Sequence, residues 1–158
     1  MCSPPLLNVD PIGLEIPLSD LRIKLLNDET SQHIVLSAPG GCGKTTLATA
    51  LCQHGDVKDK FESNIFFVDV PKLRNLMKIF QHKEIELPVF QSEKDAANHL
   101  ERLFKQIGPD PILLVLDDVW LGSKSILHKL NFRIENYKIL VTSRYEFPSF
   151  GFTYKLET

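Results

Sequence analysis

The sequence has few cysteines, no run of like charge and no long apolar stretch, and each absence excludes a class of protein. Three cysteines in 158 residues form neither a disulfide framework nor a metal-ligand spacing. A net charge of -2, without a cluster of Lys and Arg, argues against nucleic acid as the main partner. The longest apolar run, 112–116, is too short for a membrane span, and the first residues lack a secretory pattern. We therefore expect a cytoplasmic protein in a reducing setting, without membrane contact.

The composition is that of one soluble globular domain with a short arm. Apolar residues make up 43% and charged residues 24% of the chain, which are ordinary values. Residues 1–17 hold four prolines and little periodicity, which predicts an N-terminal arm or linker. A short helix capped by Ser19 is expected to open the packed domain, which then runs over 18–158. The five histidines show no ligand spacing and are expected to be surface or edge residues.

Short apolar runs alternate with helical patterns along the packed domain. Strands are predicted over 33–37, 64–70, 112–116, 137–142 and 153–156, and helices over 44–54, 71–80, 92–107 and 123–130. Gly55 is expected to stop the helix that begins at Lys44. Because strands alternate with helices, we predict an α/β fold: a three-layer α/β/α sandwich around a mainly parallel sheet of about five strands.

A glycine-rich segment between the first strand and its helix predicts the P-loop NTPase form of this fold. Glycines let backbone N–H groups surround a polyphosphate, and the helix N terminus adds partial positive charge. Lys44 would reach the β- and γ-phosphates, Thr45 would hold magnesium and Thr46 would touch the α-phosphate. Ala38 replaces the first glycine of the strict pattern, and Pro39 favours an extended geometry that alanine tolerates. The predicted phosphate-binding residues are Pro39, Gly40, Gly41, Cys42, Gly43, Lys44, Thr45 and Thr46.

Acidic and basic residues at two further strand ends complete the predicted site. Asp117 ends an apolar strand in the Walker B manner and would hold magnesium together with Thr45. Asp118 could polarise the attacking water, with Asp117 and Lys44 as the other catalytic residues, or the two acids simply end a strand. Because aspartate is shorter than glutamate, we expect slow ATP hydrolysis at most. Arg144, after the fourth strand, could contact the γ-phosphate. Trp120 is expected to serve packing.

Three segments together resemble one family, the NB-ARC domain of plant NLR immune receptors. They are APGGCGKTTLA at 38–48, LLVLDDVW at 113–120 and KILVTSR at 138–144. The cysteine-containing loop, the upstream Ile12-Gly13-Leu14 and the downstream 145–148 segment are most similar to helper NLRs with a mildew-resistance-type coiled coil. The resemblance extends from about residue 10 onward.

The resemblance implies a switch that binds ADP or ATP with Mg²⁺. ADP would hold a receptor off, exchange for ATP would turn it on, and oligomers would form with other NLR or immune-signalling proteins as partners. By resemblance, Ile12, Gly13 and Leu14 contact adenine, while Asp117, Asp118 and Arg144 line the γ-phosphate side. The helical subdomains and leucine-rich repeats of the family do not follow in this sequence. We therefore expect the nucleotide-binding subdomain alone, with weaker ADP binding than a full receptor.

Two other functions stay open at this point. A truncated interaction module could bind full-length receptors without turning nucleotide over, since intact Lys44 and Asp117 predict binding but not hydrolysis. A P-loop kinase acting on a small molecule would need an arginine-rich lid, and residues 121–136 offer only Arg133. Whether the chain is an enzyme is accordingly left open, with a slow STAND-type ATPase as the limit.

Overall fold

The computed structural model describes residues 15–27, 32–38, 43–69, 93–107, 110–120, 124–147 and 150–156. Its helices are α1 (Glu15–Asn27), α2 (Lys44–Gln53), α3 (Gly55–Phe61), α5 (Glu93–Ile107) and α6 (Lys124–Lys129). Its strands are β1 (His33–Ser37), β2 (Ile65–Asp69), β3 (Ile112–Val119), β4 (Tyr137–Ser143) and β5 (Phe152–Lys155). Within these ranges, no helix is both long and apolar enough to cross a bilayer.

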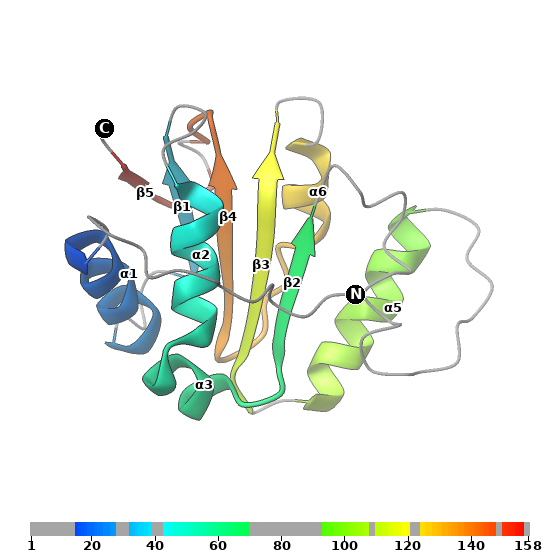
Figure 1. The fold of residues 1–158 in the computed structure, drawn as a ribbon. Helices are drawn as coiled ribbons and strands as arrows, with labels where there is room; N and C mark the ends of the chain where they lie inside the picture. The colour runs from blue at the N-terminus through cyan, green and yellow to red at the C-terminus, as the bar shows by residue number, and fades with distance from the viewer. Residues whose placement is uncertain are drawn as a thin grey trace.

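The five strands form one parallel sheet in the order β2-β3-β4-β1-β5. The arrowheads of β1, β2, β3 and β4 point upward in Figure 1, and β5 pairs parallel to β1, so all carboxyl ends lie at one edge. Strand β4 follows β1, β2 and β3 in the sequence, but in the sheet it lies between β1 and β3. Consequently the end of β4 lies between the end of β1, which precedes the glycine loop, and the end of β3, which carries the two aspartates.

The handedness of the crossovers explains why helices cover both faces. After β1 the chain crosses three positions through α2 and α3, and it then returns one strand at a time through α5 and α6. Right-handed crossovers in opposite directions place their helices on opposite faces of a sheet. Buried side chains accordingly form two clusters, one beneath α1, α2 and α3 and the other beneath α5 and α6. The predicted three-layer α/β/α sandwich is confirmed.

Alternation along each strand assigns its side chains to the two clusters. Leu113 and Val115 of β3 join the α1–α3 side, whereas Leu114 and Leu116 join the α5–α6 side. Both sets are fully buried, which is why the central strands read as continuous apolar runs rather than as alternating ones. In the α5–α6 cluster, the ring of Phe104 lies against three other aromatic rings.

Lysines from two other elements donate hydrogen bonds to the carboxyl end of helix α1. Lys60 of α3 donates to the carbonyls of Leu25 and Leu26, at 3.0 and 3.2 Å, and Lys138 of β4 donates to that of Lys24 at 3.1 Å. Last-turn carbonyls have no partner within their own helix, so these ammonium groups complete them and complement the helix dipole. This arrangement holds α1 against the sheet.

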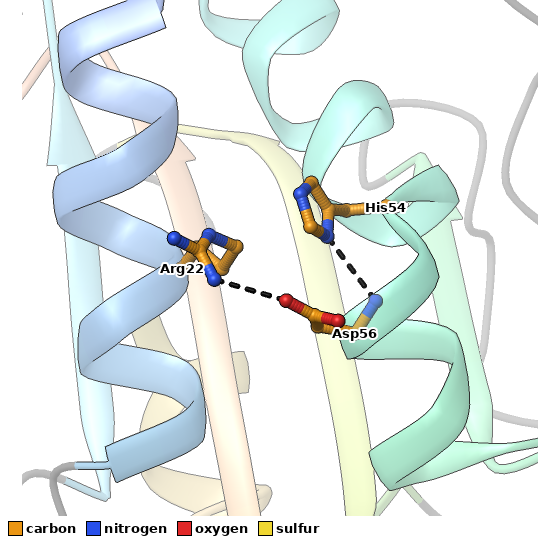
Figure 2. A network of polar contacts seen from close by, with 3 residues as sticks. All are labelled: Arg22, His54 and Asp56. Carbon is orange, nitrogen blue, oxygen red and sulfur yellow. Dashed lines mark hydrogen bonds and ion pairs between the residues drawn. The ribbon is translucent and has the colours of Figure 1, made fainter.

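A surface network joins α1 to the junction of α2 and α3 (Figure 2). Arg22 pairs with Asp56 at 3.0 Å, and the backbone N–H of Asp56 donates to His54 Nδ1 at 3.2 Å. His54 has an extended backbone that ends α2, and its ring then caps α3. Gly55 was expected only to stop a helix, but it opens α3. The exposed ion pair itself contributes little stability.

Other element boundaries also differ from the sequence predictions. Helix α1 begins at Glu15, so Ser19 lies inside the helix and not at its N-cap. Strand β3 continues through both aspartates to Val119, because each end of β3 remains paired with β4. The helix predicted over 71–80 lies outside the described residues. The division into an arm over 1–17 and a domain over 18–158 stays a prediction.

His33 is half-buried at the start of β1. Its ring stacks on Phe150 with centroids 4.4 Å apart, and its Nδ1 lies 3.0 Å from the carbonyl of Phe150. Burial lowers the pKa of His33 from its usual value and outweighs the opposing effect of that hydrogen bond. The ring therefore joins the start of β1 to the segment before β5 in its neutral form.

The lowered pKa makes stability depend on pH. The unfolded chain binds the His33 proton at higher pH than the folded chain does, so the stability that neutral His33 contributes is complete above about pH 6.5. It is lost as the pH falls from there through the lower folded pKa. We expect His33→Phe, which keeps a stacked ring, to show a smaller loss of unfolding free energy between pH 7 and pH 5. Urea denaturation at both pH values measures this, and equal losses in the two proteins would contradict it.

Candidate active site

The candidate site lies at the carboxyl edge of the sheet, where β1, β4 and β3 end. Helix α2 starts at this edge and runs down in front of the sheet (Figure 1). Ligands of open α/β sheets bind outside the carboxyl ends of the strands, at the point where the strand order reverses. Here β1 is that point, because the chain leaves it toward β2 on one side and later adds β5 on the other. The predicted residues Ile12, Gly13, Leu14, Pro39, Gly40, Gly41 and Cys42 lie outside the described residues.

The start of α2 holds the described part of the glycine loop. Gly43 has φ 83° and ψ 22°, a left-handed conformation that glycine adopts without strain. Its carbonyl accepts the first helical bond from Leu47 at 2.8 Å. Lys44 follows and is 9% exposed, whereas Thr45 is exposed and Thr46 is half-buried. The N–H of Ala38 donates to the carbonyl of Ser143 at 3.1 Å, which ties the loop to the end of β4.

Asp117 is the centre of the site. It is 5% exposed, and its carboxylate accepts hydrogen bonds from hydroxyl groups of two different elements. Thr45 Oγ1, at the start of α2, lies 3.1 Å from each carboxylate oxygen, and Thr142 Oγ1, on β4, lies 2.6 Å from Oδ1. The fold thus brings together Thr45 and Asp117, the two predicted magnesium ligands, although 72 positions separate them in the sequence.

A bulge at the end of β3 separates the two aspartates. Leu116 pairs with Val141 and Val119 with Ser143, so that two residues of β3 stand opposite the single residue Thr142. Asp118 takes the left-handed conformation, with φ 64°, and its side chain is exposed. Its N–H donates to Thr142 Oγ1 at 2.8 Å. Neither the bulge nor the contacts of Thr142 were predicted from the sequence, because the pairing of β3 with β4 is not visible there.

The residues after β3 and β4 are largely exposed. Ser143 Oγ donates to the carbonyl of Val119 and accepts the N–H of Tyr145 at 3.0 Å, which links the two strand ends. Arg144 is exposed at the same edge. Trp120 is 56% exposed, so the expectation that it serves packing is wrong for the described part of the chain.

The described residues fit a nucleotide phosphate with magnesium. Mg²⁺ prefers oxygen ligands and is usually held by one or two carboxylates together with substrate phosphates and waters. Asp117 and Thr45 supply a carboxylate and a hydroxyl at one point, beside a helix N terminus and Lys44. No cluster of three or more His, Cys, Asp or Glu occurs among the described residues. Bound there, magnesium would neutralise phosphate charge.

A separate hollow lies at the opposite edge of the sheet. Its volume is about 490 Å³, and its lining consists of Gln32, Lys60, Arg133, Ile134, Glu135, Asn136, Tyr137 and Lys138. These residues lie before β1, on α3, or at and before the start of β4, far along the strands from Asp117. The hollow therefore has no part in the candidate phosphate site.

The conformation of Asp118 leads to a stability prediction. Non-glycine residues in the left-handed region carry strain of about 1 kcal/mol that glycine does not. We expect Asp118→Gly to unfold at equal or higher urea concentration than the natural protein, and Asp118→Val to unfold at a clearly lower one. Urea denaturation followed by circular dichroism distinguishes them. Equal midpoints for the Gly and Val variants would show that the bulge is not strained.

The fold and the site define the class. A parallel sheet with β4 inserted between β1 and β3, a glycine-rich segment between β1 and α2, and a buried aspartate near the end of β3 are the features of a P-loop NTPase fold. The family described as NB-ARC domain matches residues 15–147 of this chain. The chain belongs to the NB-ARC domain family.

Two relatives among plant disease resistance proteins agree with this assignment. The chain is 42% identical over 161 residues to the Probable disease resistance protein At5g66900 of Arabidopsis thaliana, covering 99% of the chain and 20% of that protein. It is 38% identical over 160 residues to the Probable disease resistance protein At5g66910 of the same plant, covering 98% and 19%. The chain thus spans about a fifth of the length of these relatives.

The fold is shared with a much more distant protein. The crystal structure of Cdc6p from Pyrobaculum aerophilum matches with a TM-score of 0.68 at 18% identity, over 98% of this chain and 48% of that one. At this identity the likeness concerns the fold alone.

Proposed function

We propose that this chain is the ADP- and ATP-binding module of a plant immune receptor and acts as a molecular switch in the defence response. The observation that carries the proposal is the contact of Thr45 with Asp117, which places a hydroxyl and a buried carboxylate together beside the helix that follows the glycine loop. Membership of the NB-ARC family and the disease resistance relatives support the immune setting.

Each described site residue is given a role in this proposal. Lys44 and the N terminus of α2 bind the phosphates, and Thr45 with Asp117 holds magnesium. Asp118, exposed at the same edge, orients the attacking water, and Arg144 detects the γ-phosphate. The other proposed contacts are Ile12, Gly13 and Leu14 to adenine, and Pro39, Gly40, Gly41, Cys42, Gly43 and Thr46 to phosphate.

The wider proposal concerns the receptor to which this module belongs. In it, ADP holds the receptor off and ATP turns it on, followed by assembly with other NLR or immune-signalling proteins in the cytoplasm. Residues 18–158 form the nucleotide-binding subdomain and residues 1–17 the arm. The helper class with a mildew-resistance-type coiled coil rests on the sequence resemblance of the glycine loop and of residues 12–14 and 145–148.

Calorimetric titration of ADP, ATP and GDP, each with magnesium, into the chain tests the proposal. Binding of both adenine nucleotides, with weaker binding of GDP, is the expected result. Slow release of phosphate from ATP supports a switch with turnover, whereas binding without release favours the alternative of an interaction module. If neither adenine nucleotide binds, the proposed function is wrong.

A further inference from the structure

We propose that Thr142 is a positioning residue, which sets both aspartates of the site through its single hydroxyl group. Thr142 lies on β4 and was not among the predicted site residues. Its bearing on magnesium rests on the proposed function, whereas its effect on the shape of the strand end does not.

The bulge gives Thr142 its place. Because β3 has two residues where β4 has one, Thr142 alone faces both Asp117 and Asp118. Thr142 is 1% exposed, so water does not compete for its hydroxyl group. A hydroxyl offers one donor and two acceptor positions. Here the donor goes to Asp117 Oδ1 at 2.6 Å, and an acceptor position receives the N–H of Asp118 at 2.8 Å.

These two bonds fix different properties of the aspartates. The bond to Oδ1 is short and charge-assisted, which makes it one of the stronger kinds of hydrogen bond. It restricts rotation of the Asp117 carboxylate, whose oxygens also lie beside Thr45. The bond from the Asp118 N–H gives a partner to a backbone donor inside the bulge, where the regular ladder is interrupted. One side chain thus aims the metal-binding carboxylate and holds the turn that exposes the other aspartate.

Two variants separate the hydroxyl group from the shape of the side chain. Thr142→Val keeps the shape and removes the hydroxyl, whereas Thr142→Ser keeps the hydroxyl. Thr153→Val, on the edge strand β5, is the matched control for the exchange itself. The first measurement is the calorimetric affinity for ADP in magnesium and in EDTA.

We expect magnesium to raise the ADP affinity of the natural protein, of Thr142→Ser and of Thr153→Val. In Thr142→Val this gain should fall by about tenfold or more, as the loss of a hydrogen bond to a charged group predicts, while the affinity in EDTA stays near that of the natural protein. A purely structural role would lower both affinities together. A Val variant that keeps the magnesium gain, or that loses both affinities equally, would overturn the inference.

The second measurement needs no nucleotide. Hydrogen exchange of the Asp118 amide, followed by NMR, should be about tenfold or more faster in Thr142→Val than in the natural protein or in Thr142→Ser. Equal exchange in all three would show that the hydroxyl does not hold the bulge and would overturn the inference. If ADP binds but magnesium adds no affinity in the natural protein, the magnesium role of Thr142 fails while the proposed nucleotide binding stands. If neither adenine nucleotide binds, the proposed function fails, whereas the exchange rates still decide the role of Thr142 at the bulge.

Discussion

Replacing Lys44 with Ala is expected to lower the affinity of the chain for ADP and ATP by about 10- to 100-fold. A hydrogen bond between charged groups contributes about 1.5–3 kcal/mol, which corresponds to that range. Lys44 is the first residue of α2 and is 9% exposed, so its side chain is largely buried next to the start of the helix that follows the glycine loop.

The same substitution should leave the fold intact. A cation in the first turn of a helix is opposed by the helix dipole, and alanine is the residue that favours helix most strongly. We therefore expect the melting temperature of Lys44→Ala without nucleotide to equal or exceed that of the natural protein. This combination of unchanged stability and lost affinity is typical of a binding residue rather than a structural one.

A surface lysine supplies the control for the Lys44 experiment. Lys58→Ala removes the same charge from α3, where the side chain is exposed. Calorimetric titration of ADP with magnesium should give equal affinities for Lys58→Ala and the natural protein. If Lys44→Ala binds ADP as tightly as Lys58→Ala does, the phosphates bind elsewhere and the proposed site is wrong.

Replacing Phe104 with Ala is expected to lower the free energy of unfolding by about 3–5 kcal/mol. The side chain of Phe104 is 0% exposed. Its ring centroid lies 5.2 Å from that of Phe66, 5.4 Å from that of Tyr137 and 6.0 Å from that of Phe132. Removing the ring takes away its apolar burial and these contacts, and it leaves a cavity between α5 and the sheet.

A loss of this size is a large part of the stability of a domain, which is typically about 5–15 kcal/mol. Phe104→Ala should therefore unfold at much lower urea concentration than the natural protein. Phe104→Leu fills most of the space and should lose less, and Phe152→Ala, whose ring is 39% exposed, should lose about 1 kcal/mol or less. Urea denaturation of the three variants gives the order. If Phe104→Ala and Phe152→Ala have equal midpoints, α5 is not packed as described.

The sequence predicted the class of fold because each element carries its own local pattern. The apolar stripe of α5 and the apolar runs of β3 and β4 follow from helix and strand periodicity, and the structure places all three where those patterns predict. Local patterns are less informative about where a helix or strand begins and ends. A glycine at this place predicts the end of a helix, yet Gly55 is the first residue of α3. The reason is that the side chain of His54 caps α3, and the glycine alone does not indicate this cap.

Some residues of the candidate site could likewise be predicted from local sequence, and others could not. Lys44, Thr45 and Asp117 could be singled out by residue type and neighbouring pattern, and the structure places Thr45 against Asp117. The contacts of Thr142 could not be predicted from the sequence, because threonine is a common residue of β-strands and its type alone does not indicate a partner. Only its position opposite a bulge in the neighbouring strand makes it a partner of two aspartates.

By itself, the sequence determined that this protein is an α/β domain with a glycine loop, a strand that carries two aspartates and a strand that leads to Arg144. These features are local, since periodicity and motif spacing extend over a few residues. The tertiary structure alone decided the strand order, the side of the sheet that each helix covers and the bulge that turns Asp118 outward. These depend on which distant segments pair, and Thr142 meets Asp117 across 25 positions of sequence through backbone pairing that no local pattern specifies.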